Sequence, residues 1–283
     1  VPGFALFQTP YYLLIIQTIA LALGAVPIYY LARSMLHKRA LALVIAGGYL
    51  FYAPLHWINW YDFHSVAFVI PVLLAGIYFI ETGRWKTGAV FLALAAATQE
   101  NSIIAVGAVG GWYIARSLFI KADKQFLRTG IIISGLSLVY FIIVVSTIMP
   151  AFGGGLVRID RYAQLGGSFG EIIKNIFQKP QVYVETIFMW SKAVYVFWLL
   201  LPIGFLVFVS PMSLVLLIPG LAQNILTNFA SQFSSNYQYD AILVPGIFVG
   251  LIFGIKSLLR FWPSGERIMI WCLGVLFLLA FIA

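Results

Sequence analysis

The stretch TGAVFLALAAATQENSIIAVGAVGGWYIA, residues 87–115, decides how this chain folds. Apolar residues flank a polar tetrapeptide, Thr98-Gln99-Glu100-Asn101. The stretch is either one membrane-spanning helix with a buried Glu100 or two short helices joined at the tetrapeptide. An upright helix needs about 20 residues to cross the hydrocarbon of a bilayer. The choice also sets the side of the membrane on which every later loop lies.

The placement of Lys and Arg favours two helices. If the chain turns at the tetrapeptide, one side of the membrane receives 12 of the 17 Lys and Arg. These lie in the loops 33–39, 81–86, 116–128, 210–211 and 256–267. A single helix would give a weaker split of 10 against 7. Cytoplasmic loops are enriched in Lys and Arg, so we expect two helices here, with these loops in the cytoplasm.

The composition is that of an integral membrane protein. The 283 residues are 62% hydrophobic and 9% charged, with a mean hydropathy of +0.99, whereas about a quarter of the residues in soluble domains are charged. Soluble enzymes, nucleic-acid-binding proteins and disordered chains are therefore excluded. The net charge of +8 fits basic cytoplasmic loops, and the single Cys272 excludes an intramolecular disulfide and a thiolate metal cluster.

Ten apolar runs are continuous enough to be helices, and the alternation typical of a membrane barrel is missing. The runs are 11–32, 40–55, 64–80, 87–98, 102–115, 129–149, 186–209, 211–227, 240–255 and 268–283. We expect an all-α, polytopic transmembrane helical bundle with about ten membrane-crossing helices, forming one domain over residues 1–283. Val1 would lie outside the cell, in mid-loop, so we also expect a further helix before it.

The two-helix topology separates the acids from the bases. It leaves only Glu81, Asp123 and Glu266 in the cytoplasmic loops. The other six acids fall on the extracytoplasmic side: Asp62, Glu100, Asp160, Glu171, Glu185 and Asp240. We therefore expect the chemistry of this cell-membrane protein at its extracytoplasmic face.

The segment before the third apolar run carries two ionisable residues, Asp62 and His64. Such groups are costly near a membrane unless they are paired or used. A carboxylate and an imidazole two positions apart are candidates for binding a divalent metal such as Mg or Mn, or a phosphate. The neighbouring Trp57, Trp60 and Tyr61 are equally well explained as an aromatic belt at the lipid headgroups.

Glu100 and Gln99 are the second candidate pair. A carboxylate between two short apolar helices is suited to contacting a substrate or a metal. The alternative is a structural role, in which the acid caps the N-terminus of the helix over 102–115.

The region 150–185 is the long hydrophilic loop of the chain. Its Gly153–Gly155 triplet reads as a flexible hinge, and residues 169–177 predict a short helix lying on the membrane. Arg158 and Arg161 are suited to bidentate capture of a phosphate. Simple attraction to anionic headgroups is the alternative.

Hydroxyl, amide and carboxylate groups gather over residues 234–240, before the ninth run. They suggest a sugar-binding or phosphate-binding rim that includes Tyr237, Tyr239 and Asp240. Alternatively, Asp240 is only a helix N-cap. Lys192, near the outer end of its run, is expected to extend its amine to the membrane interface.

Several of these elements, taken in order, resemble the DUF2079 family of predicted membrane proteins, which is related to the GT-C superfamily of polytopic glycosyltransferases. They are Leu13–Gln17 with Pro27–Tyr29, Tyr61–His64 ahead of Pro71, Gln99–Asn101, and Tyr237-x-Tyr239 before Pro245. Where the family typically has Lys-Glu-Asp, this chain keeps only the central acid of Gln99-Glu100-Asn101. Gln238 stands where the family often has a His.

The resemblance implies a GT-C-like enzyme that moves a sugar from a polyprenyl-phosphate donor to an acceptor at the extracytoplasmic face. Asp62 and Glu100 would be the catalytic candidates, with a further general base upstream of Val1. His64, Gln99, Arg158, Arg161, Tyr237, Tyr239 and Asp240 would bind the substrate.

Two other classes of protein stay open. A transporter or lipid flippase would show inverted repeats and helices broken at mid-membrane, with polar groups along a whole path across the bilayer. Here the polar groups gather on one side. A non-catalytic subunit of a larger membrane assembly is the other alternative, because the helix-break and Tyr motifs have lost titratable groups.

Overall fold

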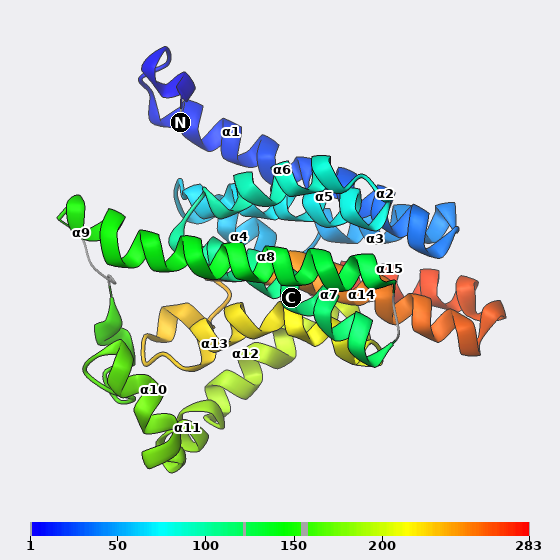
Figure 1. Cartoon of the computed structure of the whole chain (residues 1–283). Coiled ribbons are helices and arrows are strands. Elements are labelled where there is room, and N and C mark those ends of the chain that lie inside the picture. The colour runs from blue at the N-terminus through cyan, green and yellow to red at the C-terminus, as the bar shows by residue number, and fades with distance from the viewer. Residues whose placement is uncertain (1, 121–122, 154–157, 283) are drawn as a thin grey trace.

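The computed structural model describes residues 2–120, 123–153 and 158–282, and within these ranges the chain forms only helices and their connections (Figure 1). The α-helices are α1 (Pro10–Leu23), α2 (Ala25–Leu36), α3 (Arg39–Leu50), α4 (Ala53–Tyr61), α5 (Val69–Glu81), α6 (Trp85–Ala96), α7 (Glu100–Phe119), α8 (Lys124–Ile143), α9 (Met149–Ala151), α10 (Phe169–Gln178), α11 (Pro180–Ile187), α12 (Trp190–Leu200), α13 (Ile218–Ile225), α14 (Leu243–Phe261) and α15 (Glu266–Ile282). The expected all-α bundle is confirmed.

Short 3-10 helices connect these elements, and a π-helical turn over Val144–Ile148 joins α8 to α9. The 3-10 helices are η1 (Pro2–Ala5), η2 (Ser65–Phe68), η4 (Ile159–Tyr162), η5 (Leu201–Ile203), η6 (Leu206–Val209), η7 (Pro211–Leu217), η8 (Ala230–Phe233), η9 (Gln238–Asp240) and η10 (Pro263–Gly265).

Six helical stretches of the described chain are long and apolar enough to cross a membrane: Pro10–Leu36, Arg39–Tyr61, Glu100–Phe119, Lys124–Ala151, Leu243–Phe261 and Pro263–Phe281. A seventh arises if Pro180–Ile187 and Trp190–Ile203, bent by 54°, form one span. Shorter apolar helices cover Ser65–Glu81, Trp85–Ala96 and Pro211–Ile225. Together these segments account for the ten predicted runs.

Two of the runs are less regular than predicted. The run over 186–209 is not one helix, because the chain breaks between α11 and α12 and leaves α-helical geometry again at η5, where Pro202 lies. The run over 211–227 begins as the 3-10 helix η7 and becomes α13 only at Ile218, with Pro219 in its first turn. Proline lacks a backbone donor, so it starts a helix more readily than it continues one.

The chain turns at the tetrapeptide that the sequence singles out. Helix α6 ends at Ala96, Gln99 adopts an extended conformation, and α7 starts at Glu100. Trp85, at the start of α6, packs against Phe126 of α8 with ring centroids 5.1 Å apart. The start of α6 therefore lies beside the junction of α7 and α8, so α6 and α7 are antiparallel, as the two-helix interpretation predicts.

The loops predicted to be cytoplasmic meet at one end of the bundle. Lys38 forms an ion pair of 2.8 Å with Glu266, joining the α2–α3 and α14–α15 connections. Arg116 near the end of α7 pairs with Glu81 at the end of α5. We call this the basic end. The opposite end, where α4 ends and α7 and α14 begin, is the polar end.

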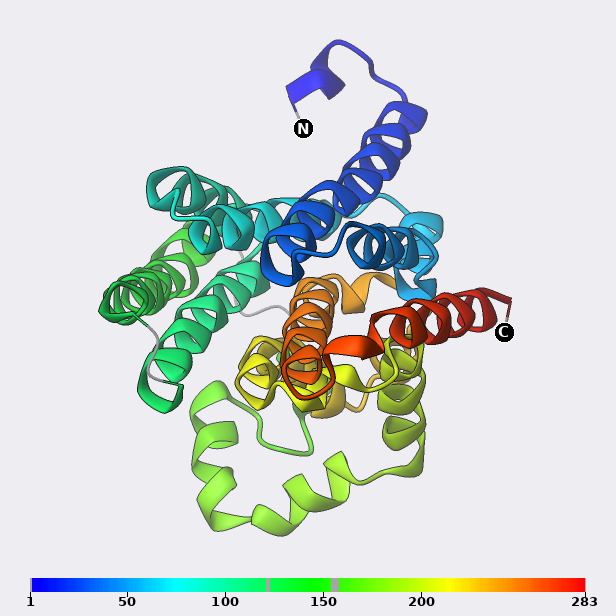
Figure 2. The same cartoon turned by 90° about the vertical axis from the view of Figure 1, so that its right-hand side faces the viewer.

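Helix α14 lies at the centre of the bundle, as the view along the helices shows (Figure 2). Its glycines at 246, 250 and 254 let the segment η6–η7 approach closely. A Cβ atom on Gly254 would come within 2.0 Å of the Leu206 carbonyl oxygen, and one on Gly250 within 2.3 Å of Val207. Small residues at this spacing allow helices to pack backbone against backbone in a membrane.

Candidate functional site

The carboxylate of Asp240 is buried at the polar end, just before the span of α14 begins. Tyr195 of α12 donates its hydroxyl hydrogen bond to Asp240 Oδ1 over 2.5 Å. The Asn224 amide of α13 donates to the same oxygen over 3.1 Å and to the Tyr195 hydroxyl over 2.8 Å. Three separate segments thus converge on one carboxylate.

Burial raises the pKa of Asp240 to about 6, and the hydrogen bonds from Tyr195 and Asn224 oppose that rise. One interpretation of the sequence makes Asp240 only a helix N-cap. The structure contradicts it, because Ile242 occupies the N-cap of α14. Ser235 lies close enough to lower the pKa as well. Even so, Asp240 Oδ2 and Ser235 Oγ make no well-formed hydrogen bond in the described chain.

Arg161 forms the second centre of the polar end. Its guanidinium lies over the Phe229 ring, 4.0 Å from the centroid. One nitrogen, Nη1, donates to Gln232 Oε1 over 3.1 Å and to the Tyr239 hydroxyl over 3.2 Å. The rest of the guanidinium fork makes no hydrogen bond to the residues that the structure describes, so it is available to an anion.

Hydrogen bonds hold the segment around Arg161 in place, although it follows the glycine triplet predicted to be a flexible hinge. The Arg161 carbonyl accepts hydrogen bonds from Asn228 N (2.8 Å) and the Thr227 hydroxyl (3.2 Å). The Tyr162 hydroxyl donates to the Gln223 carbonyl over 2.9 Å, and the side chain of Leu165 is buried. The sequence could not predict these contacts, because they join residues more than sixty positions apart.

Hydrogen bonds connect the Arg161 centre to the helix break. Asn101, next to Glu100, donates to Gln223 Oε1 over 3.4 Å. The Gln223 carbonyl accepts from Gln232 Nε2 over 2.9 Å, and Gln232 in turn accepts from Arg161. Glu100 is half-buried in the first turn of α7, where the helix dipole favours an acid. Gln99, also half-buried, is the N-cap but makes no side-chain cap bond.

Asp62 and His64 lie at the same end, ordered by a buried glutamine of α1. Gln17 donates to the Asp62 carbonyl over 2.9 Å and accepts from the His64 backbone amide over 2.8 Å. Tyr61 stacks on the His64 ring and meets the edge of Tyr237, with ring centroids 5.8 and 4.7 Å apart. The ring centroid of Tyr237 lies 6.3 Å from that of Tyr239, and the Tyr239 hydroxyl accepts a hydrogen bond from Arg161.

The Asp62 and His64 side chains do not by themselves form a metal site. Asp62 Oδ1 accepts from the neighbouring Phe63 amide over 2.7 Å, and the imidazole Nδ1 lies 3.2 Å from the Asp62 backbone carbonyl. No group of three or more His, Cys, Asp or Glu side chains within the described ranges is placed to hold a metal ion. A divalent cation therefore stays a prediction from the sequence.

The side chains of the remaining candidates make no hydrogen bond to this network among the described residues. Arg158 is exposed, with a left-handed backbone (φ 76°), and Gly154 and Gly155 of the triplet lie outside the described residues. Helix α10 covers the short helix predicted in the loop, but its position on a membrane surface stays a prediction. Lys192 is buried within the protein, and its amine donates to the Thr186 carbonyl over 2.7 Å.

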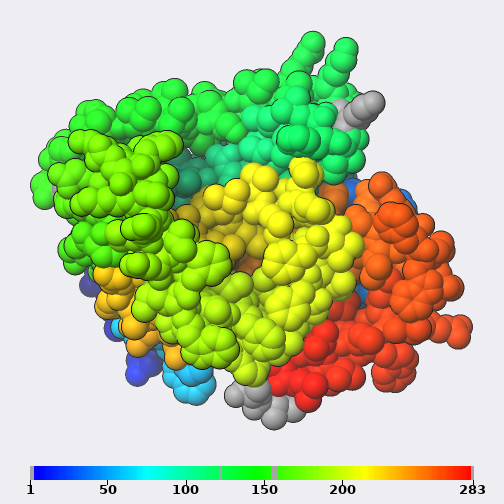
Figure 3. Space-filling view, turned by 90° about the horizontal axis from the view of Figure 1, so that it is seen from below, coloured from blue at the N-terminus to red at the C-terminus, as the bar shows by residue number. Residues whose placement is uncertain are grey.

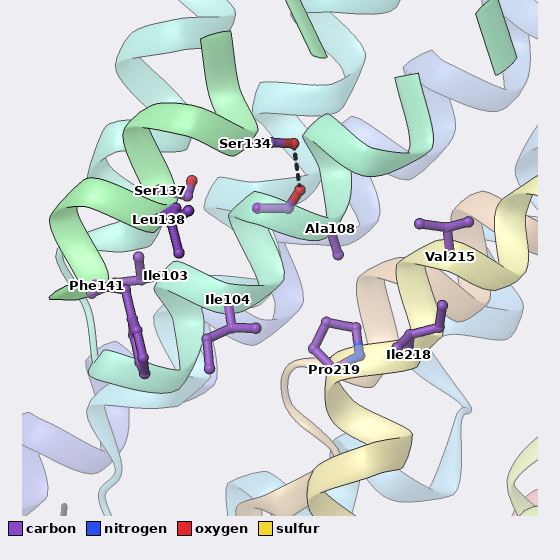
Figure 4. A pocket seen from close by; sticks show the side chains of 11 residues that line it. Ile103, Ile104, Ala108, Ser134, Ser137, Leu138, Phe141, Val215, Ile218 and Pro219 are labelled. Carbon is purple, nitrogen blue, oxygen red and sulfur yellow. Dashed lines mark hydrogen bonds between the residues drawn. The ribbon is translucent and has the colours of Figure 1, made fainter. Parts of the chain in front are cut away.

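An apolar groove of about 460 Å³ opens beside the start of α7. Its floor is α7 from Ile103 to Ala108, and its walls are α8 and the segment η7–α13 (Figure 4). In Figure 3 the surface is hollowed between the green band of α8 and the yellow helices. Ile103 lies one turn from Glu100, and α13 ends just beyond Gln223, so the groove leads to the polar network.

Sequence reasoning missed four residues that build this end: Gln17, Tyr195, Asn224 and Gln232. A signal was present for Gln17 and Asn224, since an uncharged amide inside an apolar run is costly unless it is hydrogen-bonded. No comparable signal marks Tyr195 or Gln232, whose roles depend on which segments the fold brings together.

The chain belongs to the DUF2079 family, described as predicted membrane proteins, because the family model matches residues 1–283. The resemblance seen in the sequence is therefore confirmed at the level of the family. Comparisons with curated proteins and with solved structures return no significant match.

Proposed function

We propose that this protein is a glycosyltransferase that moves a sugar from a polyprenyl-phosphate donor to an acceptor at the polar end. The observation that carries the proposal is the apolar groove on α7, which opens toward the hydrogen-bonded network of Arg161. A lipid-linked donor needs both features: an apolar track for its hydrocarbon chain and a cation for its phosphate.

The distribution of Lys and Arg supports an orientation of the bundle in the membrane. The basic loops gather at the far end of the bundle, which by the positive-inside tendency faces the cytoplasm. The polar end then faces out of the cell membrane. A donor enters sideways from the bilayer, with its chain in the groove and its phosphate near the ends of α7 and α13.

Arg161 is the group suited to the phosphate. Its ring stacking and its hydrogen bonds to Gln232 and Tyr239 fix the guanidinium plane. A fixed planar fork binds two phosphate oxygens at once and stabilises the charge that develops on the departing polyprenyl phosphate. Tyr237, Asp240, Gln99 and His64 would contribute to binding the sugar and the acceptor.

The chemistry requires a carboxylate near the reacting sugar. The acceptor hydroxyl gives its proton to the carboxylate and its oxygen attacks the anomeric carbon, while the bond from that carbon to the phosphate oxygen breaks. Glu100 is our first choice for this base and Asp62 the second. A divalent cation would supply further charge stabilisation at the phosphate.

The test is turnover of polyprenyl-phosphate-linked neutral sugars by the purified chain in liposomes. Glu100→Gln is expected to lower kcat by about 100-fold or more, the effect of losing a general base. A loss of that size in Asp62→Asn alone would assign the base to Asp62 instead. Glu266→Gln, an acid at the basic end, is the matched control and should leave turnover unchanged. Unchanged turnover in both test variants would refute the site assignment.

The groove is tested separately. Ala108→Phe fills the groove between α7 and α13 and should raise KM for the donor, whereas Ala93→Phe on the exposed surface of α6 should not. Movement of the lipid across the bilayer without transfer of its sugar would instead favour a flippase. No turnover at all, together with co-purification of a stoichiometric partner, would favour the subunit of an assembly.

A further inference from the structure

A second cavity, of about 320 Å³, lies at the polar end, apart from the groove on α7. It is formed by the start of α4, by α12 and η5, by residues 233–236 and by Ala280 of α15. Its volume is at the lower end of the range of roughly 300–1,000 Å³ seen for small-molecule sites. The cavity therefore suits a small ligand.

The lining of this cavity combines aromatic faces with uncharged polar groups. Trp57, Trp198 and Phe233 contribute the aromatic surface. Ser191, Ser234, Ser235 and Asn236 contribute hydroxyl and amide groups that both donate and accept hydrogen bonds. No residue in the lining is ionisable except Tyr195, so the chemistry favours a neutral ligand.

The charged groups nearest to the cavity lie behind its walls. Lys192 is buried with its amine 5.1 Å from the centre of the Phe233 ring. Asp240 accepts a hydrogen bond from the Tyr195 hydroxyl and lies beside the Ser235 hydroxyl. Tyr195 and Ser235 both line the cavity, whereas Lys192 and Asp240 do not.

Ser235 marks the side of the cavity next to Asp240. Its backbone is left-handed (φ 57°), which is unfavourable for a residue other than glycine. Its hydroxyl is buried and lies close enough to the Asp240 carboxylate to lower the pKa of that group. The polar groups open to a ligand are therefore those of the exposed Ser191, Ser234 and Asn236.

We infer that this cavity binds a neutral sugar ring. A pyranose has an apolar C–H face, which matches the indole of Trp57 or Trp198, and a rim of hydroxyls, which matches Ser191, Ser234 and Asn236. The inference goes beyond the proposed function, because the site does not involve Arg161, Glu100 or the groove. It would stand if the chain did not transfer sugars at all.

The experiment measures binding of free neutral sugars to the full chain in nanodiscs, which avoids sugar-based detergents. Glucose, mannose, galactose and N-acetylglucosamine are titrated by calorimetry, with glucuronate as the charged counterpart. At least one neutral sugar is expected to bind, and glucuronate more weakly, because a carboxylate would lose its water in a cavity without cations.

The variants locate the site. Trp198→Ala is expected to weaken binding of that sugar by about tenfold or more, because it removes an aromatic face. Trp60→Ala is the matched control, since Trp60 is exposed in the same aromatic region but does not line the cavity. The affinity of the Trp60→Ala variant for that sugar should equal that of the parent chain.

Asn236→Ala tests the polar rim, because it removes an exposed amide that lines the cavity. It should weaken sugar binding several-fold while leaving the unfolding temperature close to that of the parent. If Trp198→Ala does not fold, Trp198→Phe replaces it with a smaller expected loss. No binding of any neutral sugar, equal affinities in all variants, or equally tight binding of glucuronate would overturn the inference.

Discussion

The two ends of the bundle use their charges differently. At the basic end each of the three acids has a structural partner: Glu81 pairs with Arg116, Glu266 pairs with Lys38, and Asp123 caps α8. At the polar end no acid forms an ion pair with any described residue. The cations there, Arg161 and Lys192 among them, instead contact aromatic rings, amides and carbonyls.

We interpret this difference as a division of roles: the charges of the basic end stabilise the fold, and those of the polar end are suited to binding a ligand. A charge that a neighbouring side chain already neutralises stabilises the fold and has no free valence for binding a charged ligand. Charged and polar groups held in fixed positions without a counter-charge are costly, so they are most readily explained by a ligand that supplies one. The groove and the smaller cavity both open near the polar end, where these groups lie.

The largest effect should come from the basic end. Arg116→Met leaves the buried Glu81 carboxylate without its partner and should destabilise the protein by about 3–5 kcal/mol. Adding Glu81→Leu should recover most of this loss, because both charges are then gone. Unfolding by denaturant in mixed micelles measures the free energies, and a double variant as unstable as the single one would contradict the explanation.

At the polar end Arg161 should affect activity more than stability. Arg161→Ala is expected to lower donor turnover by about 100-fold, and Arg161→Lys by about tenfold, because lysine keeps the charge but loses the planar fork. Lys174→Ala, an exposed cation of the same loop, serves as the control. Equal turnover for the alanine and lysine variants would argue against recognition of the phosphate by two nitrogens.

The pH dependence of stability should reveal Asp240. Between pH about 4 and about 6 the folded protein keeps a proton on Asp240 that the unfolded chain has released, so stability falls as the pH rises through this window and is level above it. Asp240→Asn should remove this fall, on the order of 3 kcal/mol. Unfolding temperatures from pH 4 to 7 measure it, with the exposed Asp160→Asn for comparison. A fall that persists in Asp240→Asn would assign it to another group.

The smallest effect should come from the exposed pair at the basic end. Lys38 and Glu266 keep 43% and 26% of their side-chain surface exposed, so Lys38→Ala should cost no more than about 1 kcal/mol. The same unfolding assay measures it, in low and high salt. A loss as large as that of Arg116→Met would show that burial does not explain the difference between the two pairs.

Much of the fold could be predicted because it depends on local composition. The ten apolar runs, the turn at Gln99–Glu100 and the gathering of basic loops follow from hydropathy and from the counts of Lys and Arg. The irregular geometry of 186–227 could not be predicted in this way, because hydropathy does not distinguish an α-helix from a 3-10 helix. The prolines there indicate the interruptions only in retrospect.

The candidate site was predicted in part. Asp62, His64, Arg161, Tyr237 and Tyr239 are polar groups in conspicuous places, and hydrogen bonds and ring contacts join their segments at one end. Glu100, next to Asn101, and the buried Asp240 lie at the same end. Whether they act on a substrate stays a proposal. Gln223, like Asn224, is an amide inside an apolar run, which is a signal of hydrogen bonding. Gln232, which fixes Arg161, has no distinguishing feature in the sequence.

The sequence by itself determined that the chain is a helical membrane protein with most of its Lys and Arg at one end and most of its acids at the other. This follows because an apolar solvent requires apolar helices, and each loop's charge is read directly from its residues. Only the tertiary structure decided that Asp240 is buried against Tyr195 and Asn224, that Arg161 is held over Phe229, and that a groove lies on α7. Those features arise from contacts between segments far apart in the chain, and no local pattern specifies which segments meet.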